Sequence, residues 1–133
     1  MIAAFRSARP NARTAETQIQ VIEQSARLTR VAAGVRSLDV RAASRWSREL
    51  TALAAPGRTV AVDMASVDIL DSAGLGAIVG AVKSLRADGA DLVLHSVTAE
   101  VRVLLELVRL HQLLDVYNDA AEVIRTLDGE PRR

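Results

Sequence analysis

Hydrophobic and polar positions follow two different periodicities along this chain. Short runs of β-branched and aliphatic residues, of which residues 59–65 (TVAVDMA) form the clearest, have the length and composition of strands buried on both faces. Between these runs, apolar residues recur at three- and four-residue steps, the spacing of one face of an amphipathic helix. Residues 72–87 show this best, with an apolar face made of Leu75, Ile78, Val79, Val82 and Leu85.

The two periodicities alternate and so define an order of elements. Strands are expected over residues 19–22, 28–33, 59–65, 92–97 and 113–117. Helices are expected over residues 40–54 and 72–87, then from Thr98 through Val108 and from Asp119 through Leu127. The first two strands can pair as a hairpin through a turn around residues 24–25, whereas the later strands need crossover connections. The order β-β-α-β-α-β-α-β-α predicts an α/β fold, a mixed and mostly parallel sheet packed against helices.

The two ends of the chain lack this periodicity. Residues 1–17 carry Pro10 and scattered arginines, and residues 129–133 carry Gly129 and Pro131. We expect both ends to be flexible tails around one domain over residues 18–128.

Composition narrows the function classes. The 133 residues are 50% hydrophobic and 25% charged, a globular balance, and the net charge of +1 gives no attraction to nucleic acid or to an anionic membrane. There is no cysteine, and one Phe, one Trp and one Tyr leave little to stack on a planar ligand. His95 and His111 have no partner at metal-ligand spacing, so neither a metal nor a cofactor is expected. No apolar run is long enough to span a bilayer and the start does not resemble a secretory signal, so we expect a cytoplasmic protein.

The segment Asp71-Ser72-Ala73-Gly74-Leu75-Gly76 stands between a buried strand and a strongly amphipathic helix. Locally, Asp71 or Ser72 serves as a helix N-cap, and spacing alone favours that interpretation. The same geometry also suits a switch, because a hydroxyl at a helix start is reachable and a phosphate there is tolerated by the free N–H groups. Asp63, Asp68 and Asp71 would add to the negative charge of that phosphate.

Residues 59–124 resemble a STAS domain, and in particular the free-standing bacterial anti-sigma-factor antagonists. Three segments carry the resemblance: VAVDMASVDILDSAGLGAIVGAVK, ADGADLVLHSVTAEVRVLLEL and LHQLLDVYNDAAEVI. The pattern Asp-Ser-x-Gly-Leu-Gly is the family's phosphorylation motif, which implies that Ser72 is the acceptor. The chain departs from the family in two extra residues within 34–39, in Val108-Arg109-Leu110 where Thr-Gly-Leu is usual, and in the charge of Asp68.

The resemblance implies a partner-switching mechanism. The unphosphorylated protein binds an anti-sigma factor, commonly a serine kinase of the GHKL type, and phosphorylation of Ser72 releases it until a serine phosphatase resets the cycle. The protein itself is then not an enzyme, inserts into no membrane and contacts no nucleic acid directly. The residues expected to contact the partner are Asp71, Ala73 and Gly74, with Ser66, Val67 and Asp68 on the rim. For Asp71, a plain N-cap role is equally compatible with the sequence.

Other functions fit the residues less well. Gly74, Gly76 and Gly80 approach a dinucleotide fingerprint, but two of the three fall inside the helix, where a small-residue groove for helix packing explains them better. A receiver domain needs an acidic cluster after its first strand, and only Glu23 is available there. The main alternative keeps the fold: a STAS subunit of a membrane transport ATPase or of a stress-sensing complex.

Overall fold

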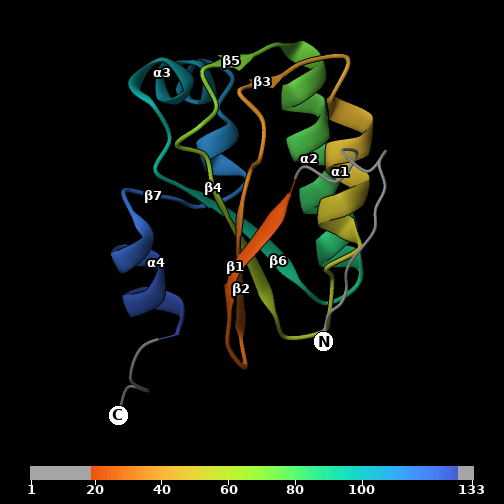
Figure 1. The fold of residues 1–133 in the computed structure, drawn as a ribbon, viewed down its shortest axis with the longest axis vertical. Helices are drawn as coiled ribbons and strands as arrows, with labels where there is room; N and C mark the ends of the chain where they lie inside the picture. Colours follow the sequence, from red (N-terminus) through yellow and green to blue (C-terminus); the bar gives the residue numbers. More distant parts are fainter. Residues whose placement is uncertain (1–18, 129–133) are drawn as a thin grey trace.

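A five-stranded sheet forms the centre of residues 19–128, the part of the chain that this computed structural model describes (Figure 1). From edge to edge it consists of β1 (Gln20–Gln24), β2 (Leu28–Ala32), β4 (Thr59–Asp63), β6 (Asp91–His95) and β7 (Val116–Tyr117). Only the β1–β2 pair is antiparallel, and every other neighbouring pair is parallel. The predicted mixed, mostly parallel sheet is therefore confirmed. The tails predicted for residues 1–17 and 129–133 lie outside the described residues.

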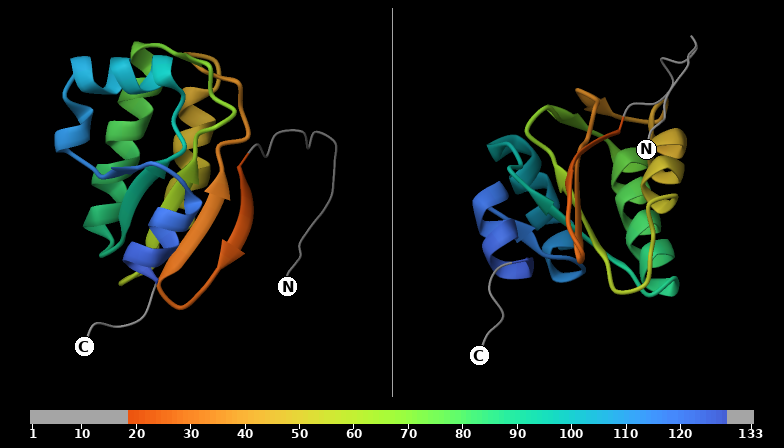
Figure 2. Two further views of the ribbon diagram at one scale, coloured as in Figure 1. Left: turned by 90° about the vertical axis from the view of Figure 1, so that its left-hand side faces the viewer. Right: turned by 60° about the horizontal axis from the view of Figure 1, so that its bottom comes forward.

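Helices cover both faces of this sheet. They are α1 (Ala43–Thr51), α2 (Ser72–Ala87), α3 (Ala99–Leu107), which is followed by the short 3₁₀ helix η1 (Leu110–Gln112), and α4 (Ala120–Leu127). Figure 2 shows α1 and α2 side by side on one face and α4 on the other. The main core lies under α1 and α2, and a smaller cluster joins Val123 of α4 to Leu28, Ala61 and Val93.

Two very short strands were not expected from the sequence. β3 (Ser37–Leu38) and β5 (Ile69–Leu70) pair in parallel as a separate two-stranded sheet above the carboxyl ends of the main strands (Figure 1). The predicted order of elements otherwise holds, with shifted bounds. Gln24 pairs with Thr29 inside the hairpin, so the predicted turn begins one residue too early. The last strand, predicted over residues 113–117, covers only Val116–Tyr117, because Leu113 and Leu114 form the turn that follows η1 and bond back to Leu110.

Strand β1 lies at one edge of the sheet and all five of its residues are exposed. Its pairing with β2 is irregular, since Val21 lies opposite Val31 and Glu23 lies opposite Arg30. Ile22 therefore forms a bulge between two paired positions. The bulge leaves the edge strand without a continuous register.

Trp46 fixes α1 to the sheet. Its side chain is fully buried in the main core, and its indole Nε1 donates a hydrogen bond to the carbonyl oxygen of Ala33 at 3.1 Å. A buried indole N–H normally finds such a partner. The bond places the start of α1 close to the carboxyl end of β2.

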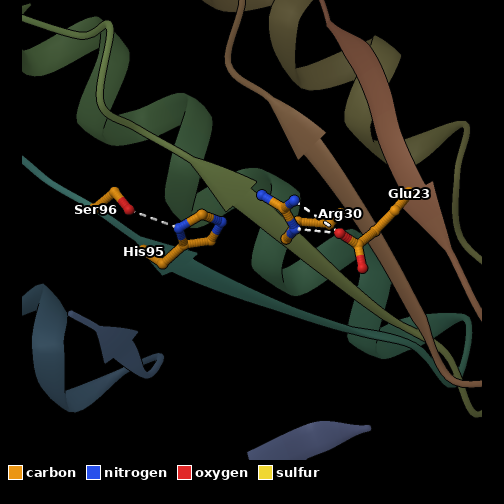
Figure 3. A network of polar contacts seen from close by, with 4 residues as sticks. All are labelled: Glu23, Arg30, His95 and Ser96. Carbon is orange, nitrogen blue, oxygen red and sulfur yellow. Dashed lines mark hydrogen bonds and ion pairs between the residues drawn. The ribbon is translucent and has the colours of Figure 1, made fainter. Parts of the chain in front are cut away.

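A buried histidine lies on the α4 side of the sheet. His95 lies at the end of β6, and its Nδ1 atom is 2.8 Å from Ser96 Oγ. Figure 3 shows this contact and, beyond it, the ion pair of Arg30 with Glu23. The ring is fully buried and its Nε2 atom has no hydrogen-bond partner among the described residues. Burial lowers the pKa of His95 below its ordinary value of 6.5; nearby Asp63 and Asp119 oppose that shift and Arg30 adds to it.

This lowered pKa predicts acid sensitivity. The folded state holds His95 neutral while the unfolded chain takes up a proton below about pH 6.5, so the free energy of unfolding falls as the pH drops through that range, by at most about 1.4 kcal/mol per pH unit. Urea unfolding at pH 7.5 and 5.5 measures the effect. His95→Asn should reduce the difference between the two pH values, with His111→Asn, at an exposed position, as the control. Equal differences in wild type and His95→Asn would contradict the assignment.

Candidate partner-docking site at the start of α2

Ser72 occupies the first position of α2 and its side chain is exposed. The residue before it, Asp71, is the N-cap, and its Oδ1 atom accepts a hydrogen bond from the Gly74 N–H at 2.9 Å. Its other oxygen, Oδ2, accepts from the Val40 N–H at 3.2 Å. One carboxylate thus holds both the first turn of α2 and the segment that leads into α1. The cap role that the sequence left open is confirmed, and it presents the Ser72 hydroxyl to solvent on a rigid element.

Gly74 is buried where the first turn of α2 lies against the β3–β5 sheet. A Cβ atom at this position would collide with the Leu38 carbonyl oxygen and would crowd Leu70 Cδ1. The backbone of α2 therefore approaches β3 closely at Gly74, where only glycine fits. Its buried position makes it an internal spacer rather than a surface for a partner, which corrects the prediction of partner contact.

Gly76 and Gly80 have a different environment. Both are exposed, and a Cβ atom at either position would meet nothing within 4 Å. The interpretation of these glycines as a helix-packing groove is wrong, because the small residues that α2 buries are Gly74, Ala77 and Ala81. The exposed glycines instead continue the surface that begins at Ser72, at steps of four residues.

The loop from β4 to β5 contributes part of the predicted rim. Ser66 is exposed and donates its hydroxyl to the Val35 carbonyl oxygen at 2.9 Å. Asp68 forms an ion pair with Arg36 at 2.8 Å. Val67 is fully buried in the main core, so its prediction as a rim residue is wrong. Its apolar side chain anchors the loop while its polar neighbours face outward.

Exposed apolar side chains flank Ser72, and the sequence analysis missed them. Val40 is 73% exposed and Ile69 is 53% exposed. Val40 also lines a hollow of about 430 Å³ between α1 and α2, together with the half-buried Ala73 and the buried Ala77. Exposed apolar patches of this kind mark surfaces that another protein covers. The available signal was an apolar residue next to charged ones in each segment: Val40 lies between Asp39 and Arg41, and Ile69 follows Asp68.

The charge around Ser72 is partly balanced. Arg36 neutralises Asp68, and Asp63 accepts a hydrogen bond from the Ala65 N–H at 2.9 Å.

Within residues 19–128, no three His, Cys, Asp or Glu side chains gather in a way that would hold a metal ion. No helix in that same part of the chain has the length and apolar character to cross a membrane.

Residues 30–123, well over half of the chain, match the family model described as STAS domain. The chain belongs to the STAS domain family. The family expected from the Asp-Ser-x-Gly-Leu-Gly segment is thereby confirmed, and with it the STAS fold.

Curated relatives of this STAS domain include the proteins named anti-sigma-B factor antagonist from Listeria monocytogenes and from Listeria innocua. Each is 34% identical to it over 67 residues, which cover 50% of this chain and 59% of the relative. The matched part thus spans less than two thirds of the length of these relatives.

Solved structures similar to this STAS domain agree on the fold. An anti-sigma-factor antagonist domain protein from Planctomyces limnophilus superposes with a TM-score of 0.72 at 19% identity, covering 84% of this chain and 98% of that one. An anti-sigma factor antagonist from Mycobacterium paratuberculosis superposes with a TM-score of 0.65 at 18% identity, covering 86% of this chain and 97% of that one. A putative anti-sigma factor antagonist from Thermotoga maritima superposes with a TM-score of 0.63 at 22% identity, covering 75% of this chain and 88% of that one. At these identities the likeness extends to the fold alone.

Proposed function

We propose that this STAS domain is an anti-sigma-factor antagonist whose unphosphorylated form binds an anti-sigma factor and whose switch is phosphorylation of Ser72. The observation that carries the proposal is the exposed Ser72 hydroxyl on the first residue of a sixteen-residue helix, held there by the Asp71 cap. The relatives named as antagonists support the same role.

The surroundings of Ser72 explain how one phosphate would act as a switch. A phosphoserine carries about −1.5 to −2 charges, and the start of α2 tolerates it because free N–H groups and the helix dipole favour an anion there. A partner that covers Val40 and Ile69 would bury Ser72 with them and would have to desolvate that dianion beside the Asp71 carboxylate. A cost of about 3 kcal/mol lowers affinity more than a hundredfold, enough to release the partner.

The partners that fit this mechanism are an anti-sigma factor that is itself a GHKL-type serine kinase and a serine phosphatase that resets the site. The chain's own role is then binding rather than catalysis, in the cytoplasm and without direct contact to nucleic acid. The docking surface consists of Ser72, Asp71 and Ala73, with Ser66 and Asp68 on its rim.

A phosphorylation assay tests the proposal. Wild type and Ser72→Ala are incubated with the cognate anti-sigma-factor kinase and ATP, and phosphate incorporation should be lost only in the variant. Ser84→Ala is the matched control, because Ser84 is an exposed serine further along the same helix. Equal incorporation in wild type and Ser72→Ala would overturn the switch. A binding measurement with Ser72→Glu should show the hundredfold loss of affinity for the kinase.

A further inference from the structure

A second surface feature lies at the start of α1. A polar cavity of about 440 Å³ opens there, lined by residues 34–37 and by Asp39, Arg41, Ala42 and Arg45. The residues come from the segment that follows β2 and from the first turn of α1, which the Trp46 hydrogen bond holds close together. The cavity therefore lies at the carboxyl ends of the parallel strands, the edge where α/β proteins commonly bind ligands.

Three arginines give this cavity its character. Arg36, Arg41 and Arg45 all line it, although acidic residues outnumber basic ones in residues 19–128 as a whole. Asp39 provides the only carboxylate that the described residues contribute to the lining, and it lies 3.6 Å from the Arg41 guanidinium. Arg45 has no ion pair among the described residues. Arg36 and Arg41 thus each have a carboxylate partner, in Asp68 and Asp39, and Arg45 supplies the positive charge of the cavity that no described carboxylate pairs with.

We propose that this cavity binds a phosphate monoester dianion. Guanidinium groups keep their charge at every physiological pH and match phosphate oxygens with paired, parallel N–H donors. No aromatic side chain of residues 19–128 lines the cavity, so this part of the chain offers nothing there on which a nucleobase could stack. The first turn of α1 contains no acidic residue and its N-cap makes no side-chain hydrogen bond, so no carboxylate in that turn competes with the ligand.

Arg36 connects this cavity to the loop that leads to Ser72. Its side chain bonds to Asp68 at 2.8 Å, and its carbonyl oxygen accepts hydrogen bonds from the N–H groups of Asp68 and Ile69. A phosphate in the cavity competes with Asp68 for the Arg36 guanidinium. Phosphate binding and partner docking at Ser72 then influence each other reciprocally. This coupling rests on the proposed function, whereas phosphate binding itself does not.

An NMR titration of the full chain tests the site without any partner protein. Inorganic phosphate, O-phosphoserine and a short phosphoserine peptide are added separately at constant ionic strength, and saturable amide shifts are expected at residues 34–45. The double variant Arg41→Gln/Arg45→Gln should bind at least tenfold more weakly. Arg48→Gln is the matched control, because Arg48 lies on α1 and outside the cavity lining, and its affinity should equal that of wild type.

The outcomes separate the parts of the proposal. Tighter binding of the peptide would identify a protein-borne phosphate as the ligand, and equal binding of all three probes would identify a free phosphate ester. Asp68→Asn frees Arg36 and should raise the affinity severalfold; unchanged affinity would overturn the coupling. Shifts that do not saturate, or that persist undiminished in the double variant, would overturn the site whatever the kinase assay shows at Ser72.

Discussion

Replacing Gly74 with alanine should lower the free energy of unfolding by about 2–3 kcal/mol. The added methyl group meets the backbone carbonyl oxygen of Leu38 and the side chain of Leu70, so the first turn of α2 and the β3–β5 sheet must move apart. Overpacking against a fixed backbone group costs typically about 1–3 kcal/mol, and the close contact at this position favours the upper part of that range. Urea unfolding at pH 7.5 measures the change.

Gly80→Ala is the matched control for this experiment. Gly80 lies in the same helix with open space around its Cβ position, so alanine there should raise the free energy of unfolding by about 0.5–1 kcal/mol through helix propensity alone. The two variants thus make the same chemical change with opposite expected signs. A stabilising effect of Gly74→Ala would contradict the packing described for the start of α2.

Removing the Asp71 side chain should cost about 2 kcal/mol of unfolding free energy and should also weaken partner binding. Asp71→Ala loses the N-cap bond to Gly74, worth about 1 kcal/mol, and the bond to Val40, worth about 1 kcal/mol more. With both bonds gone, the starts of α1 and α2 are no longer joined at this point. Thermal or urea unfolding of Asp71→Ala against wild type gives the magnitude.

Asp71→Asn separates the contribution of the hydrogen bond to Gly74 from that of the hydrogen bond to Val40. The amide keeps one oxygen that can accept from the Gly74 N–H, but its NH₂ group then faces the Val40 N–H, and two donors cannot bond. Asn should therefore retain the cap and lose the connection to α1, with a cost about half that of alanine. If Asn and Ala destabilise equally, the bond to Val40 is not the separate contribution that the geometry indicates.

Most of the architecture could be predicted from the sequence because long elements carry a long periodic signal. Residues 72–87 show five apolar positions at helical spacing, and the observed helix has those bounds. β3 and β5 could not be predicted in this way, since a strand of two residues has no period to detect. Their pairing depends on the distant register of Ser37 with Ile69, which only the folded chain establishes.

The candidate site was predictable where its chemistry is local. An Asp-Ser pair before an apolar helical pattern is recognisable as a helix start, so Asp71 and Ser72 could be placed there from their neighbours, and the structure decides that Asp71 is the cap. Val67 was predicted on the rim together with its chain neighbours Ser66 and Asp68, whereas its own side chain reaches the core. The arginine-lined cavity has no motif, because Arg36 is brought to Arg41 and Arg45 by the β3 segment and the start of α1.

The irregular register of β1 bears on how this molecule avoids aggregation. A sheet edge with free N–H and C=O groups can recruit a strand from a second molecule, and the exposed Val21 and Ile22 would favour such contact. The extra residue at Ile22 breaks the repeat that an incoming strand would need to follow, and the Glu23–Arg30 ion pair places charge beside it. The bulge and the ion pair together make this edge a poor template for the addition of a strand from a second molecule.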